Sequence, residues 1–99
     1  MTDRELLELA AKAVGIYLTI EYLGHEKYKP DWNPLLDDGD ALRLAVKLRL
    51  EVCVWDTDTT VLTPNDNIST ISEPTEGDPY AATRRAIVRA AAEIGRGQA

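Results

Sequence analysis

The segment DDGDALRLAVKLRLEVCVW, residues 37–55, contains a helix start, an amphipathic helix and a strand in immediate succession. Aspartate is a favoured N-cap residue, and clustered carboxylates stabilise the positive end of a helix dipole. The helix is therefore expected to begin within 37–40, with Asp38 as its cap, and to run to about Leu48. The apolar and β-branched residues 50–55 then predict a strand. A helix followed directly by a strand favours a fold in which helices cover a sheet.

Two further helices are predicted at the two ends of the chain. Residues 3–14 form the first, with Thr2 or Asp3 as the cap, Glu5 as capping-box partner of Thr2, and Gly15 at its end. The last helix starts at Pro79 after the cap Asp78 and ends at Gly95 and Gly97. The residues expected to face the core follow the helical period: Leu6, Leu9, Ala10 and Ala13 in the first helix; Leu42, Ala45, Val46 and the stem of Arg49 in the second; Tyr80, Thr83, Ile87, Ala91 and Ile94 in the third.

The remaining strands are predicted from alternation and from β-branched runs. Apolar residues alternate with polar ones along residues 16–22, which predicts a strand with one buried face. Residues 60–63 form a short strand, and residues 67–72 are an optional fourth. The order α-β-α-β-β-(β)-α predicts one α/β (α+β) domain over residues 1–99. We expect an αβα-type sandwich with three helices and a mixed or antiparallel sheet of three to four strands.

The composition is that of a soluble globular domain. The chain has 99 residues, of which 44% are hydrophobic and 28% charged. No apolar run approaches the roughly 20 residues of a membrane helix, and the first residues lack the basic character of a signal peptide, so we expect no membrane association. Cys53 is the single cysteine, which excludes an internal disulfide and favours a reducing cytoplasm.

The charges are distributed unevenly along the chain. Residues 1–78 hold seven basic and 16 acidic side chains, whereas residues 79–99 hold four arginines and one glutamate. Nucleic-acid affinity depends on basic contacts to phosphates, so an acidic body makes a nucleic-acid partner unexpected. Arg84, Arg85 and Arg89 form a basic patch on the last helix that is a candidate site for a phosphate or an acidic partner. The alternative is a solvated helix surface.

The densest group of unusual residues surrounds the start of the second helix. Trp32, Asn33, Asp37, Asp38 and Asp40 are the candidate residues for binding a ligand or partner. In that interpretation Trp32 stacks on a flat ligand and Asn33 hydrogen-bonds its edge. The alternative, which we favour, is a capped helix start with Trp32 packed on the core.

Carboxylates so close together also raise the question of catalysis or metal binding. The calcium-loop pattern fails, because Val61 stands where glycine is needed and Asn67 where glutamate is needed. The chain has one histidine and one cysteine, and no ligand spacing fits zinc. We therefore expect no metal, no cofactor and no catalysis, and a binding protein for another protein or a small ligand. The alternative is a carboxylate-dependent enzyme or metal-binding protein that uses Asp37, Asp38 and Asp40.

Three stretches together resemble one known family. They are MTDRELLELAAKA at residues 1–13, WNPL at 32–35 with DDGDALRLAVKL at 37–48, and AATRRAIVRAAAEIG at 81–95. With these stretches the chain resembles the phage ABA sandwich domain family, which comprises small bacteriophage and prophage proteins of unknown function. The resemblance implies an αβα sandwich encoded by a phage or prophage gene, and it implies no activity.

Overall fold

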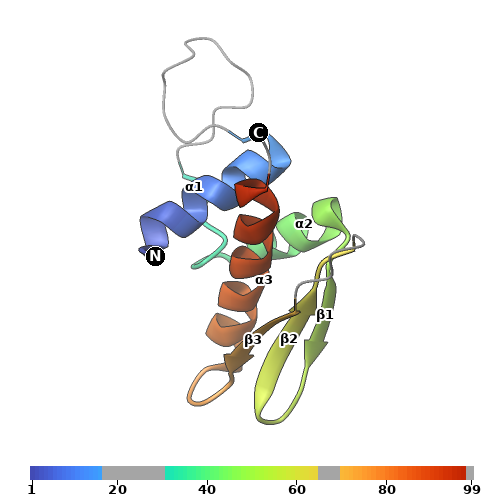
Figure 1. Cartoon of the computed structure of the whole chain (residues 1–99). Coiled ribbons are helices and arrows are strands. Elements are labelled where there is room, and N and C mark those ends of the chain that lie inside the picture. The colour runs from blue at the N-terminus through green and yellow to red at the C-terminus, as the bar shows by residue number, and fades with distance from the viewer. Residues whose placement is uncertain (17–30, 65–69, 98–99) are drawn as a thin grey trace.

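Residues 1–16, 31–64 and 70–97 are described by the computed structural model. They form the helices α1 (Asp3–Val14), α2 (Asp38–Leu48) and α3 (Pro79–Arg96) and the strands β1 (Glu51–Val54), β2 (Asp58–Leu62) and β3 (Thr70–Pro74) (Figure 1). The strands form one antiparallel sheet in the order β1-β2-β3. The predicted α+β class, with three helices and an antiparallel sheet of three strands, is therefore confirmed.

Two predicted strands fall partly or largely outside the described residues. Of the strand predicted over 16–22, only Ile16 is described, and it lies just after the end of α1. Of the strand predicted over 67–72, residues 70–72 belong to β3, which continues to Pro74. The strand predicted over 60–63 is β2, which begins at Asp58. Among the described helices, none is long and apolar enough to span a membrane.

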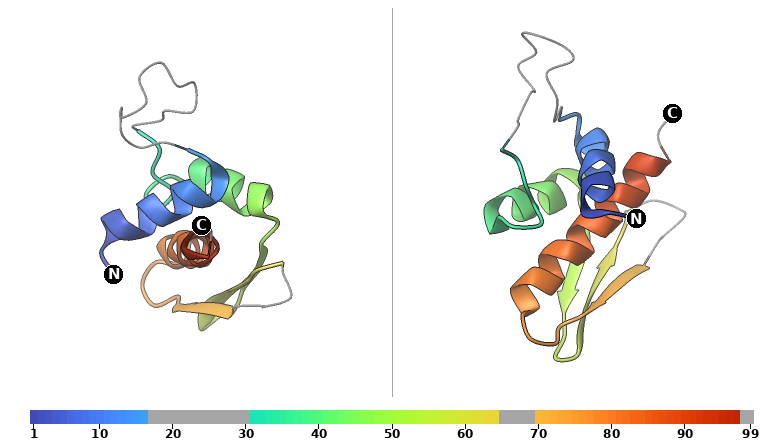
Figure 2. Two further views of the ribbon diagram at one scale, coloured as in Figure 1. Left: turned by 45° about the horizontal axis from the view of Figure 1, so that its top comes forward. Right: turned by 90° about the vertical axis from the view of Figure 1, so that its left-hand side faces the viewer.

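Helix α3 is the middle layer of the described fold. Figure 2 shows it between the sheet on one side and α1 with α2 on the other. A helix covered on two sides needs small or apolar residues around most of its circumference. The buried residues of α3 meet that need: Ala82, Ala86, Ile87, Val88, Ala90, Ala91, Ala92 and Gly95. The narrower stripe predicted for this helix is correct at Ile87 and Ala91 and wrong at Tyr80, which is exposed.

The crossing of α1 and α3 depends on a glycine inside α3. A Cβ atom on Gly95 would lie 1.9 Å from the carbonyl oxygen of Leu9, far inside van der Waals contact. Gly95 is buried and lies one residue before the end of α3 at Arg96. The expectation that Gly95 ends the helix is therefore wrong: its role is to let the two helix backbones approach each other.

The helix ends follow local side-chain chemistry. Thr2 and Glu5 form the predicted capping box at α1, and Gly15 ends that helix with a φ of 75°. Asp78 caps α3 by accepting the N–H groups of Tyr80 and Ala81 at 3.0 and 3.1 Å. At α2 the cap is Asp37, whose carboxylate accepts the N–H of Asp40 at 2.7 Å. The prediction of Asp38 as the cap is wrong by one residue.

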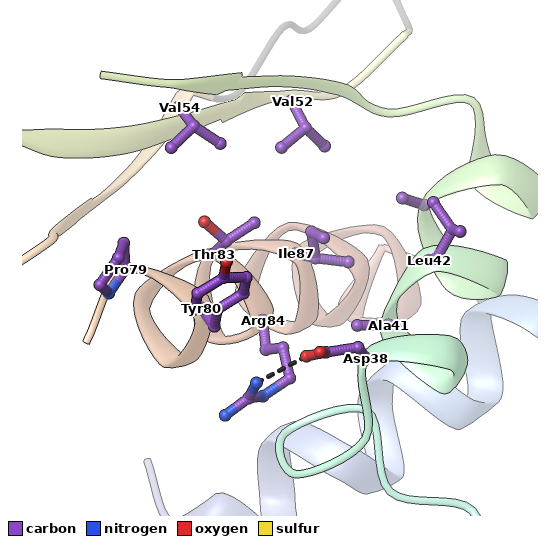
Figure 3. A pocket seen from close by; sticks show the side chains of 11 residues that line it. Asp38, Ala41, Leu42, Val52, Val54, Pro79, Tyr80, Thr83, Arg84 and Ile87 are labelled. Carbon is purple, nitrogen blue, oxygen red and sulfur yellow. Dashed lines mark hydrogen bonds and ion pairs between the residues drawn. The ribbon is translucent and has the colours of Figure 1, made fainter. Parts of the chain in front are cut away.

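The buried face of α2 also differs from the prediction. Ala41, Leu44 and Ala45 are buried, whereas Leu42 and Val46 are 63% and 69% exposed. The apolar residues of this helix span a wider arc than its contacts with α3 and α1 cover, so periodicity alone did not define which part faces inward. Leu42 lies on the side of α2 that faces β1 (Figure 3), and Val46 follows it one helical turn later.

Candidate functional site

An apolar groove of about 600 Å³ lies between β1, α2 and the N-terminal half of α3 (Figure 3). Most of its wall is hydrocarbon, supplied by side chains from the three elements. The lining residues are Asp38, Ala41, Leu42 and Ala45 from α2, Val52 and Val54 from β1, and Pro79, Tyr80, Thr83, Arg84 and Ile87 from α3.

The groove exists because α3 diverges from the sheet on the β1 side. On the β2 side, the hydroxyls of Thr59 and Thr83 lie 3.0 Å apart and share a hydrogen bond, and Thr59 is fully buried. On the β1 side, Val52 and Val54 point towards α3 across open space (Figure 3). Sheet and helix therefore form a wedge that is closed at β2 and open at β1.

Large apolar side chains remain exposed along the opening of this wedge. Val54 and Tyr80 are mostly exposed at one end of the groove, and Leu42 is mostly exposed at the other. Single exposed apolar residues are ordinary on protein surfaces, but a contiguous group around a concavity is typical of a binding site. This group makes the groove the strongest candidate site in the described part of the chain.

One side of the groove is polar and rigid. The Nη1 atom of Arg84 lies 2.6 Å from a carboxylate oxygen of Asp38, and its Nε donates to the carbonyl oxygen of Leu35 at 2.9 Å. The Arg84 side chain is 16% exposed, so two fixed partners hold it within the wall. The groove thus combines an apolar body with one oriented polar pair, the usual composition of a small-molecule site.

The predicted acidic site is not assembled as a site for catalysis or metal binding. Asp37 caps α2, and Asp38 pairs with Arg84. Asp40 accepts the backbone N–H of Asn33 and the guanidinium of Arg43, both at 2.9 Å. Asp37 and Asp40 both lie within ion-pair distance of Arg43, whereas Asp38 pairs with Arg84. Within residues 1–16, 31–64 and 70–97, no three His, Cys, Asp or Glu side chains gather to hold a metal ion.

The two remaining residues of that candidate group are also occupied in the fold. The Oδ1 atom of Asn33 accepts the N–H of Leu35 at 3.0 Å, and its carbonyl oxygen accepts the N–H groups of Leu36 and Asp37. Trp32 is partly buried and packs against the hydrophobic core. Both arrangements match the favoured interpretation, a capped helix start with Trp32 on the core.

The predicted basic patch is divided among three contacts. Arg84 binds Asp38, Arg85 binds Asp3 at 3.0 Å, and Arg89 binds Glu73 and the carbonyl oxygen of Ser72. Each arginine connects α3 to a different neighbour, namely the start of α2, the start of α1, and β3. These side chains are therefore fixed by acidic partners and do not form one open anion-binding surface.

Sequence reasoning missed the groove residues Leu42, Val52, Val54 and Tyr80. The signal that could have found them was the number of apolar residues within 41–46, because one helix–helix contact cannot bury all of them.

Neither the family models, nor the curated proteins, nor the solved structures compared with this chain include a match to it.

Proposed function

We propose that this protein is a small, non-catalytic binding module that takes a small apolar ligand into the groove between β1, α2 and α3. The observation that carries the proposal is the groove itself, with a volume of about 600 Å³ and a predominantly apolar wall. Binding sites for small molecules commonly have volumes of about 300–1,000 Å³ and a few oriented polar groups.

The lining defines the chemistry of the expected ligand. Its apolar body lies between Val52 and Val54 on one wall and Thr83 and Ile87 on the other. Its polar end lies near the Asp38–Arg84 pair, the one charged pair in the wall. A neutral hydroxyl or amide suits this place, because an anion would compete with Asp38 and a cation would compete with Arg84.

An apolar segment of a host protein is the second candidate occupant. The observation that favours it is the exposure of Leu42, Val54 and Tyr80, which line the groove. Patches of this kind also mark protein-binding surfaces. The small ligand is preferred because the wedge is deep enough to bring Ala41 and Ile87, which are buried, into its lining.

The engagement of Asp37, Asp38 and Asp40 in capping and ion pairs supports a non-catalytic role. The resemblance of three stretches to the phage ABA sandwich domain family supports an origin in a phage or prophage gene. The single cysteine supports a location in the cytoplasm of the bacterial host. These three features belong to the same proposal.

The test is a titration with the neutral apolar dye N-phenyl-1-naphthylamine, followed by dye fluorescence. We expect saturable binding to the unmodified chain and a loss of affinity of about tenfold or more in Leu42→Arg and Val54→Arg, which place a charge in the apolar groove. Leu36→Arg is the matched control, because Leu36 is 77% exposed and does not line the groove. Circular dichroism checks that all variants are folded. Absence of saturable binding, or equal binding by all variants, overturns the proposal.

A further inference from the structure

We infer that β1 pairs with β1 of a second copy of this chain, so that two three-stranded sheets join into one antiparallel sheet about a two-fold axis. The inference goes beyond the proposed function, because it concerns the edge of β1 and holds whether or not the groove takes a ligand.

The first observation is the free edge of β1. The sheet order β1-β2-β3 leaves one side of β1 without a partner strand in the part of the chain that the structure describes. Trp55 donates its N–H to the carbonyl oxygen of Asp58 at 2.8 Å, so the backbone groups of Trp55 point towards β2. Backbone groups alternate along a strand, and those of Val52 and Val54 therefore point to the free edge.

β1 contains no proline, no lysine and no bulge, although it is short and begins with the charged Glu51. Protective features of natural edge strands include proline, lysine and bulges, which hinder pairing with another chain. The residues of β1 are Glu-Val-Cys-Val, and its register with β2 is continuous from Glu51 to Val54. Within residues 1–16, 31–64 and 70–97, the N–H and C=O groups of Val52 and of Val54 therefore have no partner strand at this edge.

The alternation also fixes the register of the pair. With Cys53 opposite Cys53 of the second copy, Val52 lies opposite Val54 of the second copy, and these two residues exchange their N–H···O bonds. Residues of the same face then meet across the axis, so both copies of α3 lie on one side of the joined sheet. All the outward-pointing backbone groups of β1 are used in this register.

Charge complementarity identifies the occupant as a second copy. Lys47 and Arg49 lie shortly before β1, and neither forms an ion pair within the described residues. Glu51, which begins β1, offsets one of these two charges. At the other end of β1 lie Asp56, which follows the strand, and Asp78 at the start of α3. No basic residue occurs in the sequence between Arg49 and Arg84.

An antiparallel pair places the basic end of each copy beside the acidic end of the other. The same rotation brings the exposed Leu42 and Val46 of one copy towards the exposed Val54 and Tyr80 of the other. Both sets of contacts are formed twice, because a two-fold interface is self-complementary. Lys47 and Arg49, together with the exposed Leu42, Val46, Val54 and Tyr80, thus find partners in one arrangement.

The single cysteine gives a direct test of the register. Cys53 and its copy occupy a pair without backbone hydrogen bonds, where Cα atoms are about 4.5 Å apart, within the range that a disulfide spans. We expect the thiol oxidant diamide to convert the reduced chain rapidly into a covalent dimer. The control is Cys53→Ser with Thr60→Cys, which moves the thiol to the paired position on β2, on the same face but one strand from the edge. Equal cross-linking of both proteins overturns the inference.

A charge exchange tests the partner. In sedimentation equilibrium without dye, we expect the unmodified chain to dimerise. Two variants should each raise the dimer dissociation constant about tenfold or more. One is the double variant Lys47→Glu/Arg49→Glu, and the other is the single variant Asp56→Lys. A mixture of these two variants should restore dimers, because every like-charge contact becomes an opposite-charge contact in the heterodimer. An unmodified chain that stays monomeric, or a mixture that stays monomeric, overturns the inference. Dye binding and oligomeric state are separate measurements, and the variants at Lys47, Arg49 and Asp56 test the dimer without changing the groove lining.

Discussion

Arg84 and Asp38, 46 residues apart in the chain, form an ion pair in which Nη1 and Oδ1 lie 2.6 Å apart. The same guanidinium donates from Nε to the carbonyl oxygen of Leu35. Arg84 therefore connects α3 both to the loop before α2 and to the first turn of that helix. Because Asp38 and Arg84 also line the groove, the stability of the α2–α3 contact and the shape of the groove depend on one side chain.

Replacement of Arg84 by methionine is expected to lower the free energy of unfolding by about 1–3 kcal/mol, because the partly buried carbonyl of Leu35 loses its donor. Asp38→Asn should cost about 0–1 kcal/mol, since the Asp38 side chain is 70% exposed and exposed ion pairs contribute little. Urea unfolding followed by circular dichroism measures both. Because Arg84→Met removes both contacts, equal losses in the two variants would show that the ion pair, and not the carbonyl contact, holds this junction.

The cap of α2 gives a second prediction. Asp37→Ala should lower stability by about 1 kcal/mol, the usual effect of removing an N-cap side chain. Asp37→Asn should retain most of that stability, because the amide oxygen also accepts the N–H of Asp40. Asp38→Ala should cost less than Asp37→Ala, since Asp38 lies inside the helix and its ion pair is largely exposed. Thermal melts with equal losses for the two alanine variants would contradict the assignment of Asp37 as the cap.

Gly95 gives the sharpest steric prediction. Gly95→Ala should destabilise the fold by about 1–3 kcal/mol or more, because the added methyl group meets the backbone of Leu9 and forces α1 and α3 apart. Gly97→Ala is the matched control, since a Cβ there meets no atom closer than 3.6 Å and the backbone is right-handed. Its melting temperature should be unchanged or slightly raised. A tolerated Gly95→Ala would mean that the helices do not cross at this distance.

The capping box of α1 predicts a pH effect. The pKa of Glu5 is lowered from its ordinary value, first by the backbone N–H of Thr2 and then by the Thr2 hydroxyl. A lowered carboxyl pKa stabilises the fold above the pKa of the unfolded chain, and this stabilisation is lost as the pH falls through the pKa of the folded state. Side-chain carboxyl NMR shifts recorded between neutral and acidic pH should show the low pKa. Thr2→Ala should raise that pKa by removing the hydroxyl, and an unchanged pKa in that variant would exclude the hydroxyl as a cause.

The features that the sequence predicted correctly are those determined by neighbouring residues. The capping box of Thr2 and Glu5, the left-handed Gly15 and the cap Asp78 each depend on a few adjacent positions. The bounds of α1 agree with the prediction for the same reason. Short-range chemistry also explains why the aspartates around α2 could be interpreted as structural before their contacts were known.

The features that were missed depend on contacts between distant elements. Periodicity located the apolar residues of α2 but not the part of their arc that α3 covers, so Leu42 and Val46 were placed in the core. α3 is buried on two sides because it lies between the sheet and α1. The need for glycine at position 95 follows from its contact with the backbone of Leu9, which is distant in the sequence. The groove arises where sheet and helix diverge, which no local pattern encodes.

Trp32 gives the last prediction, which separates a core residue from a surface anchor. Trp32 is partly buried and packs on the core. Trp32→Ala should therefore lower the free energy of unfolding by about 2–3 kcal/mol. This is somewhat less than the roughly 3–5 kcal/mol lost when a fully buried aromatic side chain is replaced by alanine. Trp55→Ala is the control, because Trp55 is 59% exposed and makes a single side-chain hydrogen bond to Thr60; it should cost about 1 kcal/mol or less. Under conditions where Trp32→Ala remains folded, binding of N-phenyl-1-naphthylamine should be unchanged, since Trp32 does not line the groove. Unchanged stability in Trp32→Ala combined with lost dye binding would instead make Trp32 the anchor of a binding surface and move the ligand site away from β1.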